Sequence, residues 1–379
     1  MRPVFISIFT VAVLFPIDIR VLIADMPPPY TITGAHVTVL NAAYSNVIAD
    51  APSVTFSPNA KGVTVVDKGV FTRVVVTASN ASVNGQPFNG TFVLCRDADK
   101  LAIINVVPME DYIAGVLPYE MGPSWPLEAL KAQAVAARSY SLHYLLACAG
   151  KGNYDVENTT RHQVYRGTRA VTAAVRAAVS ATAGEVMLFR NKVVPAYFHA
   201  SCGGYTEGMY RIFKIDIPYL RGGPCYYCTT NAKRWTLDIP LASFSKLITT
   251  GTHTVKSVFI TETDASGRAV SLTLVSDGGS FIVPAPLIRK TVGPKKLPSL
   301  NFTLAVSNGT AHLKGVGNGH GVGMCQVGAY GMAQHGFTYR TILENYYKLI
   351  EIRDVRSVKD ISPDIWNLKE SYLNAFFSR

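Results

Sequence analysis

Acidic residues are scarce in this sequence. The chain has 379 residues, with 25 Asp and Glu against 36 Lys and Arg, and its net charge is +11. No run of five or six Lys or Arg occurs, so a nucleic-acid groove has little support. A diffuse positive surface would suit any polyanion, including bacterial cell-wall polymers, and it would equally serve solubility alone. No internal repeat or low-complexity tract is present, and a hydrophobic fraction of 48% indicates a globular protein with a substantial core.

Several ligand-binding motifs are missing as well. Despite 30 glycines, no GxGxxG can be read in the glycine-dense run GVGNGHGVGMCQVGAYGMAQHG at residues 315–336, and no phosphate loop of the GxxxxGK[ST] type is present. No HExxH occurs either, which argues against a zinc hydrolase. Glycine serves a backbone that bends sharply or approaches something closely. The run therefore needs an explanation other than nucleotide binding.

The first 24 residues form a separate segment. Arg2 precedes the apolar run PVFISIFTVAVLFPI, and Asp18 and Arg20 follow it. The run is short for a membrane span, which needs about 20 residues. It matches the apolar region of a secretory signal, with a small residue at Ala24 for cleavage. We expect residues 1–24 to be a signal peptide or an uncleaved membrane anchor, and the protein to be exported to the periplasm or the outer face of the cytoplasmic membrane.

The remaining sequence predicts an α+β fold of mixed helices and antiparallel sheet. Residues 25–95 contain alternating segments such as HVTVL and TRVVVTA, separated by Gly and Asn, which is typical of strands joined by hairpins. The segment LEALKAQAVAARSYSLHYLLA, residues 127–147, has a helical period and follows a Pro-Ser-Trp-Pro start signal. A second, alanine-rich helix is expected from Thr168 to about Ala183.

A small β-rich subdomain is expected to interrupt the main domain, residues 96–354, at about residues 236–306. There, FITETDASGRAVSLTLVSDGGSFIV predicts a three-stranded meander with turns at Ser266-Gly267 and Asp277-Gly278. Residues 355–379 are expected to form a C-terminal tail.

Glu120 is a candidate general acid. It lies between Tyr119 and Met121, just before the helix that begins at Leu127. Aromatic and thioether surface would desolvate the carboxyl group and raise its pKa. The positive end of the helix would instead favour the ionised form. The residue could also simply cap that helix, and the sequence leaves these alternatives open.

Two cations follow on the same helix. Lys131 and Arg138 are seven residues apart and therefore share one helix face. Together they could bind the carboxylates of a substrate. Ordinary surface charge on buried aliphatic stems is the alternative.

The cysteines suggest a metal site. His199-x2-Cys202 and Cys225-x2-Cys228 provide two ligand pairs with the spacing of a tetrahedral structural zinc site. Four protein ligands would leave no open position, so such a zinc ion would be structural. In an exported protein, a disulfide from Cys202 to Cys225 or Cys228 is the alternative. The other three cysteines are expected to be isolated buried thiols: Cys95, Cys148 and Cys325.

Five ordered motifs resemble a known family. NVVPMEDYIAGVLPYEMGPSWPLEALKAQAVAARSYSLHY resembles the signature block of the stage II sporulation protein D family, which includes the amidase enhancer LytB. HQVYRG, FHASCGGYTE, PYLRGGPCYYC and the loop GHGVGMCQVGAYGMA match further family segments. The resemblance extends from about residue 101 to residue 349.

This resemblance implies a peptidoglycan lytic transglycosylase that acts in cell-wall remodelling at sporulation or division. It would cleave the MurNAc-GlcNAc β-1,4 bond of glycan strands that a partner amidase has stripped of stem peptides, and leave 1,6-anhydromuramyl ends. Glu120 matches the catalytic glutamate of the family. Four residues match positions of its substrate cleft: Lys131, Arg138, His320 and Tyr330. Glycines would then let the backbone approach several sugars, and Gln326 would project with His320 and Tyr330 to bind the glycan.

The sequence departs from the family at two places. Ser-Gln-Trp is usual in the family where Cys325-Gln326-Val327 occurs here, and Pro is usual at Gly122. Loss of the serine hydroxyl and the tryptophan ring could weaken glycan binding. The alternative function is therefore a non-catalytic glycan-binding enhancer of a cell-wall amidase.

Overall fold

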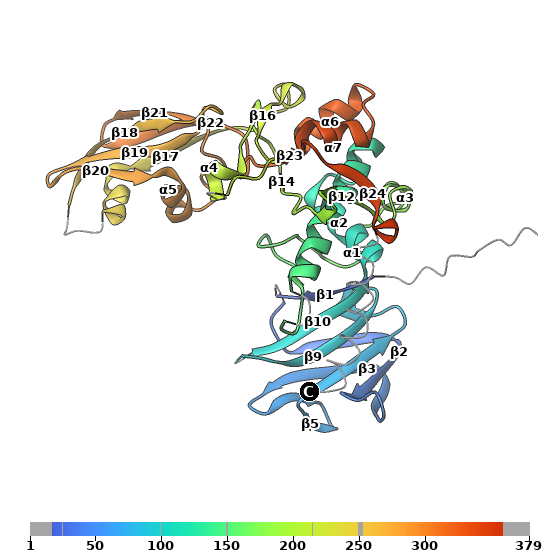
Figure 1. The fold of residues 1–379 in the computed structure, drawn as a ribbon. Coiled ribbons are helices and arrows are strands. Elements are labelled where there is room, and N and C mark those ends of the chain that lie inside the picture. The colour runs from blue at the N-terminus through green and yellow to red at the C-terminus, as the bar shows by residue number, and fades with distance from the viewer. Residues whose placement is uncertain are drawn as a thin grey trace, which may run out of the picture.

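The computed structural model describes residues 17–24, 26–98, 100–148, 151–213, 215–248 and 253–358. It has three parts, which Figure 1 shows as a sheet of early strands, a body of helices next to it, and a β-rich arm that projects from the helical body. Helices combine with mostly antiparallel sheets, so the predicted α+β fold is confirmed.

The first part is a sheet with the strand order β11-β1-β10-β9-β6-β2-β3-β4-β5, to which β7 and β8 attach through β2. All of its pairings are antiparallel except that of β1 with β11. Val, Ile and Phe side chains bury one face of the sheet, and a smaller cluster around Val75, Val93 and Ile104 covers the other face of its central strands. Its strands are β1 (Asp18–Leu22), β2 (Tyr30–Asn41), β3 (Val47–Asn59), β4 (Gly62–Val65), β5 (Gly69–Phe71), β6 (Arg73–Ala78), β7 (Ser82–Val83), β8 (Gln86–Pro87), β9 (Thr91–Asp97), β10 (Lys100–Pro108) and β11 (Val156–Glu157).

Strand β1 corrects the boundary expected at residue 24. It lies between β10 and β11, and Ile19 and Val21 are fully buried. Arg20 forms a buried ion pair with Asp155 at 2.7 Å. Cleavage after Ala24 would remove this strand from inside the sheet. Residues 1–16, which hold most of the predicted apolar segment, lie outside the described residues. Within the described ranges, no helix is long and apolar enough to cross a membrane.

The helical body surrounds α2 (Leu127–Ala147), which confirms the predicted helix. Most of α2 is buried on all sides, because Ala and Ser let neighbouring elements approach closely. The second predicted helix is shorter than expected: it begins after Thr172, whose hydroxyl accepts a hydrogen bond from Val175 N. The neighbours of α2 are α1 (Met109–Glu120), α3 (Ala173–Ala181), α6 (Gln326–Gln334), α7 (Tyr339–Tyr346), β12 (Glu185–Phe189) and β13 (Lys192–Val193).

Short elements connect the body with the arm. They are β14 (Phe198–His199), β15 (Tyr205–Thr206), α4 (Met209–Phe213), β16 (Gly223–Pro224), η1 (Tyr226–Cys228) and β23 (Met324–Cys325). After α7, the chain returns to the body as β24 (Glu351–Asp354), which pairs with β12, and ends in η3 (Val355–Ser357) within the described residues. Strand β14 pairs in parallel with β23, and this pairing joins the two sequence segments that flank the arm.

The arm, residues 234–316, has its own hydrophobic core around Phe244, Leu274 and Leu313. Its two sheets have the orders β17-β22-β21 and β18-β19-β20, and the second is the predicted meander. Arg234 pairs with Val316, so the arm leaves and rejoins the body at one place. Its elements are β17 (Arg234–Pro240), η2 (Leu241–Leu247), β18 (Val255–Thr263), β19 (Ala269–Ser276), β20 (Gly279–Pro284), α5 (Ala285–Val292), β21 (Phe302–Ser307) and β22 (Thr310–Val316).

Candidate functional site

Glu120 is the last residue of α1 and does not cap α2. The first residue before α2, Pro126, makes no side-chain cap, and six residues separate Glu120 from Leu127. The carboxyl group therefore lies at the negative end of a helix dipole, which disfavours its ionised form. Burial raises the pKa of Glu120, and a hydrogen bond from the backbone of Val164 opposes this rise only in part. Burial and the helix end thus act in the same direction here.

One oxygen of Glu120 is held in place and the other is not. Val164 N donates to Oε1 over 2.8 Å. Within the described part of the chain, Oε2 has no hydrogen-bond partner and Glu120 forms no ion pair. The side chain is half-buried. This leaves one carboxyl oxygen available to an incoming ligand.

The loop that holds Glu120 is the HQVYRG motif, residues 162–167. Gln163 is fully buried, and its Oε1 accepts hydrogen bonds from the Ser141 hydroxyl at 2.7 Å and the Tyr112 hydroxyl at 3.1 Å. These bonds fix the loop against α1 and α2, and so direct the N–H of Val164 toward Glu120. The sequence showed HQVYRG as a family match, but the contact with Glu120 only appears in three dimensions.

Tyr330 lies close to the chain segment that follows Glu120. Its ring centroid is 5.1 Å from that of Trp125, which lies between α1 and α2, and the two rings meet edge to face. Tyr330 is half-buried, and its hydroxyl accepts a hydrogen bond from Gln334 Nε2 at 2.8 Å. The structure therefore places Tyr330 next to the segment that follows Glu120. Its neighbour Trp125 was not assigned to the site from the sequence.

Gln326 is buried at the start of α6. Its Nε2 donates to Oε1 of Gln133 in α2 over 3.3 Å. Gln133 is fully buried, and its own Nε2 has no hydrogen-bond partner. These contacts give Gln326 a role in joining α6 to α2.

His320 belongs to a different cluster. Its Nδ1 accepts a hydrogen bond from Val322 N at 3.1 Å, and its ring is 5.6 Å from the ring of His199 and 6.2 Å from that of Tyr197. Burial, together with the nearby charges of Arg289 and Arg268, lowers the pKa of His320 to about 4. The imidazole is therefore neutral near pH 7.

Several glycines of the glycine-rich run pack closely against other parts of the chain. Gly321 has a φ of +87°, and a Cβ there would come within 2.7 Å of the Arg268 guanidinium group. In α6, a Cβ at Gly328 would come within 2.0 Å of the Tyr346 hydroxyl and 2.6 Å of Cys225 Sγ. Glycine is needed at these positions because other parts of the chain approach the backbone closely.

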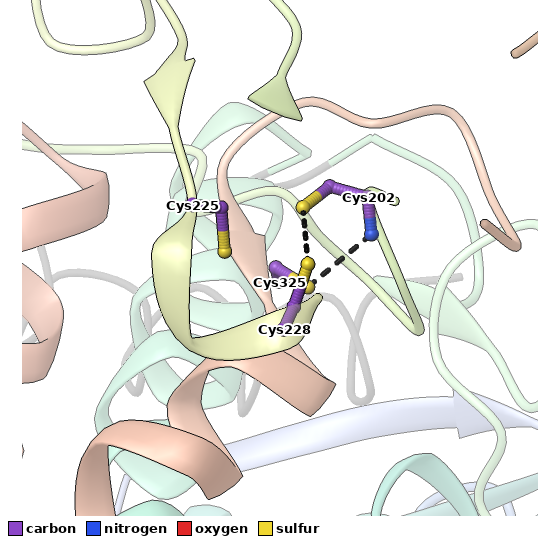
Figure 2. A group of neighbouring side chains, drawn as sticks. All are labelled: Cys202, Cys225, Cys228 and Cys325. Carbon is purple, nitrogen blue, oxygen red and sulfur yellow. Dashed lines mark hydrogen bonds between the residues drawn. The ribbon is translucent and has the colours of Figure 1, made fainter. Parts of the chain in front are cut away.

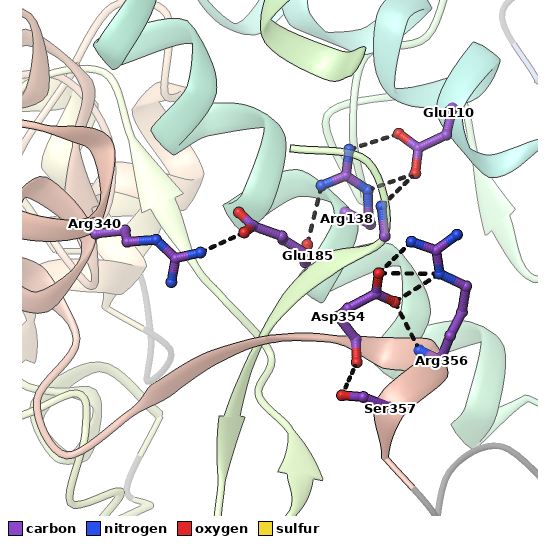
Figure 3. Close-up of polar contacts among 8 residues, drawn as sticks. Glu110, Arg138, Glu185, Arg340, Asp354, Arg356 and Ser357 are labelled. Carbon is purple, nitrogen blue, oxygen red and sulfur yellow. Dashed lines mark hydrogen bonds and ion pairs between the residues drawn. The ribbon is translucent and has the colours of Figure 1, made fainter. Parts of the chain in front are cut away.

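Both cations that were predicted to bind carboxylates are paired with acidic residues of the protein itself, and Figure 3 shows the pair of Arg138 with Glu110. Arg138 is buried; it donates to both carboxylate oxygens of Glu110, at 2.6 and 3.0 Å, and to the backbone oxygen of Glu185 at 3.0 Å. Lys131 forms an ion pair with Glu128 at 2.7 Å. Arg138 thus joins α1, α2 and β12, and its position in an alanine-rich helix reflects this buried bond.

Four cysteines gather in a buried group, which we call the cysteine cluster: Cys202, Cys225, Cys228 and Cys325. Their sulfur atoms all lie within 4.8 Å of one another. Figure 2 shows that Cys225 and Cys228 belong to one turn, while Cys202 and Cys325 come from separate segments. The prediction that Cys325 is an isolated thiol is therefore wrong. Cys95 is a free buried thiol as predicted, whereas Cys148 is only half-buried.

His199 does not belong to the cysteine cluster, and Cys325 replaces it as the fourth residue. His199 Nδ1 lies 3.1 Å from the backbone oxygen of Val322, and its buried Nε2 has no hydrogen-bond partner. Cys325 occupies the N-cap position of α6, directly beside the other three cysteines.

The cysteine cluster can hold a metal ion. Four soft sulfur ligands suit zinc, and tetrahedral Zn–S bonds of about 2.3 Å would place the sulfur atoms roughly 3.8 Å apart. Backbone N–H groups surround the sulfurs: Cys202 N and Gly328 N donate to Cys325 Sγ at 3.2 and 3.3 Å, and Gly204 N donates to Cys202 Sγ at 3.4 Å. Such bonds stabilise thiolates in metal sites. The residues present therefore fit zinc.

The part of the helical body that contains α1, α2 and α3 corresponds to a known class of protein. A family profile described as "Stage II sporulation protein" matches residues 97–189, and a second profile, for a domain of unknown function, matches residues 228–323. The first match includes Glu120 and the HQVYRG loop. The second covers the arm.

Individual relatives agree with this class. Stage II sporulation protein D of Bacillus subtilis is 30% identical over 264 residues, which cover 65% of this chain and 75% of that protein. The amidase enhancer of B. subtilis is 28% identical over 72% of this chain and 44% of its own length. An uncharacterized protein of Brachyspira hyodysenteriae is 37% identical over 92% of this chain and 96% of that protein. The chain belongs to the stage II sporulation protein D family, which is linked to sporulation and cell-wall processing.

Proposed function

We propose that this protein is a peptidoglycan lytic transglycosylase that cleaves the MurNAc-GlcNAc β-1,4 bond of peptide-stripped glycan strands. The observation that carries the proposal is the state of Glu120. Its pKa is raised by burial, it forms no ion pair among the described residues, and one of its oxygens is available to a ligand. A carboxyl group in this state can donate a proton near neutral pH.

The reaction needs only one such group. Glycosidases usually use two carboxylates, one as acid and one as nucleophile or base. In a lytic transglycosylase, Glu120 would give its proton to the oxygen of the bond being cleaved, and the bond to the anomeric carbon would break. The C6 hydroxyl of the same sugar would then bond to that carbon, while ionised Glu120 takes the hydroxyl proton. No water is consumed, and the product has a 1,6-anhydromuramyl end.

Other parts of the site would position the strand. Trp125 and Tyr330 would offer aromatic surface beside Glu120. His320, which packs against Tyr197, would contact a sugar further along the glycan strand. A zinc ion in the cysteine cluster would hold α6 against the turn that carries Cys225 and Cys228. The protein would act in the cell envelope after export. A cell-wall amidase would be its functional partner, because it removes the stem peptides.

A digest of peptide-free glycan strands, read by mass spectrometry, tests the proposal. Wild-type protein should release fragments with anhydro ends, and Glu120→Gln should release none. Glu344→Gln is the matched control, because Glu344 is an exposed residue of α7 outside the site. Undiminished fragments from Glu120→Gln would remove this residue from its role.

The second candidate function is a non-catalytic amidase enhancer. The observation in its favour is the similarity to the B. subtilis protein named amidase enhancer, although this chain spans less than half of that protein. In that case the wild-type protein should produce no anhydro ends from any strand. It should instead increase the rate at which an added amidase releases stem peptides, and Glu120→Gln should do so equally well.

A further inference from the structure

The turn between β18 and β19 fastens the arm to the body. Arg268, at the end of this turn, is buried and donates from Nη1 to the backbone oxygen of Tyr205 at 3.0 Å and from Nη2 to that of Cys202 at 2.8 Å. Ser266 of the same turn lies with its Oγ 2.8 Å from Oε2 of Glu207, which follows β15 in the body. Ser266 and Glu207 are also buried. A buried polar cluster therefore joins the two parts of the protein.

Two carboxyl groups meet at the Ser266 hydroxyl. Its Oγ lies 2.6 Å from Oδ1 of Asp264 and 2.8 Å from Oε2 of Glu207, and it accepts a hydrogen bond from Arg268 Nη1 at 2.8 Å. A serine hydroxyl has one proton, and a guanidinium group only donates. The hydroxyl can therefore donate to one carboxyl group, and the other carboxyl group must bring a proton of its own. The geometry thus requires one proton on the pair.

Backbone contacts indicate that Glu207 holds this proton. Oδ1 of Asp264 accepts hydrogen bonds from the backbone N–H groups of Ser266 at 2.8 Å and Arg268 at 3.1 Å, which favours its ionised form. Glu207 accepts one backbone bond, from Gly208 N to Oε1 at 2.7 Å, so Oε2 can be the protonated oxygen. Burial and the contact with Asp264 raise the pKa of Glu207 to about 7. Burial opposes ionisation of Asp264 as well, but its hydrogen bonds outweigh this effect and its pKa is lowered.

With one proton on the pair, the cluster is neutral, because the charges of Asp264 and Arg268 cancel. The segments that pack against Glu207 carry other titratable side chains: Tyr205, Tyr210, Arg221 and His320. Arg221 is exposed to solvent, and the imidazole of His320 is neutral near pH 7. Ionisation of Glu207 would therefore leave a negative charge without compensation in a buried place, which is costly.

We propose that Glu207 and Asp264 form a pH-sensitive latch, which holds the arm against the body while they share a proton and loosens it when both are ionised. The inference is independent of the proposed function. Since Glu207 binds its proton more tightly in the latched state, the latch is strongest below about pH 4.5 to 5 and weakens as pH rises through 7. The guanidinium group of Arg268 lies close against Gly321, so loosening of the arm would also free the glycine-rich segment that leads to α6.

Hydrogen exchange of the full chain measures the latch. Gly208 N donates to Glu207 itself, and Gly319 N donates to the backbone oxygen of Pro298 in the arm at 2.9 Å. Exchange of these two amides, corrected for the intrinsic rate at each pH, reports how often the arm loosens. Their protection should fall about tenfold between pH 5.5 and pH 8.

Three variants identify the group responsible. Glu207→Gln has an amide that can donate to Ser266 Oγ at every pH, so protection should stay constant over this range. Asp264→Asn removes the ionised neighbour that helps to raise the pKa of Glu207, and the fall in protection should move to lower pH. Glu262→Gln is the control, because Glu262 is an exposed residue of β18, and it should behave as the wild type.

Constant protection in the wild type would overturn the proposal. A fall that persists in Glu207→Gln at the same pH would do so too, because another group would then titrate. If Glu207→Gln does not fold, Asp264→Asn decides alone: a fall at the wild-type pH contradicts the latch, and a fall at lower pH supports it.

Discussion

The backbone N–H of Val164 donates a hydrogen bond to Oε1 of Glu120 over 2.8 Å, which joins the end of α1 to a loop 44 residues further along the chain. The bond orients the carboxyl group while burial keeps its pKa raised. A group that is oriented but not neutralised by a cation suits proton donation. Because an ionised carboxylate is poorly solvated at this buried position, Glu120 lowers the free energy of unfolding.

Glu120→Gln should therefore abolish activity and slightly raise stability near neutral pH. The amide has a similar shape and its oxygen can still accept the bond from Val164, but it carries no charge to desolvate. We expect a gain on the order of 1 kcal/mol in the free energy of unfolding, measured by urea titration. A marked loss of stability would show that the carboxylate itself supports the fold.

The stability difference between the two proteins should depend on pH. The folded-state pKa of Glu120 is raised above the ordinary value of 4.5, so the folded protein binds more protons than the unfolded chain just above pH 4.5. Wild-type stability should fall relative to that of the Gln variant as pH rises from there through the raised pKa of Glu120. Activity should fall over the same range, because the acid must begin protonated. Melting curves of the wild type and the Gln variant at several pH values measure this difference. A difference in stability that stays constant with pH would contradict the expectation.

The cysteine cluster should bind about one zinc ion per chain. Cys325→Ser and Cys202→Ala should lose most of the metal and melt at a lower temperature. His199→Ala should keep the metal, because His199 is not among the clustered residues. Elemental analysis of the purified proteins measures the content directly. Metal-free wild type with a disulfide, or full zinc content in Cys325→Ser, would contradict this assignment.

The ion pair between buried Arg138 and Glu110, whose side chain is 39% exposed, should be important for stability. Arg138→Met removes the bonds of the guanidinium group to Glu110 and to the backbone of Glu185, and we expect a loss of roughly 2 kcal/mol in the free energy of unfolding. Arg161→Met is the control, since the Arg161 side chain is 75% exposed and its pair with Glu157 should contribute less than about 1 kcal/mol. Similar denaturant midpoints for both variants would show that Arg138 is free to serve another role.

Truncation of the N-terminus should show that β1 is needed for the fold. A protein that begins at Ile17 keeps β1 and should show a cooperative unfolding transition. One that begins at Met26 lacks β1, loses buried Ile19 and Val21, and leaves Asp155 buried without Arg20. It should be destabilised by several kcal/mol or fail to fold. Circular dichroism and thermal melts compare the two, and equal melting temperatures would contradict the place of β1 in the sheet.

Features that depend on neighbours in the sequence were predictable. The helical period of residues 127–147, the turns at Ser266-Gly267 and Asp277-Gly278, and the family motifs around Glu120 each lie within a few residues of one another. The direction of the helix-dipole effect on Glu120 was predicted wrongly, because the sequence analysis did not predict α1, which ends at this residue.

Local composition and order along the chain determined the α+β class, the inserted arm and the family, since propensity and pattern act over short distances. Tertiary structure alone decided which groups meet: Cys325 with the other three cysteines, Arg138 with Glu110, and Val164 with Glu120. The reason is physical. Burial, charge pairing and metal-ligand geometry depend on distances in space between residues that are far apart in the chain, and no spacing within a single motif encodes those distances.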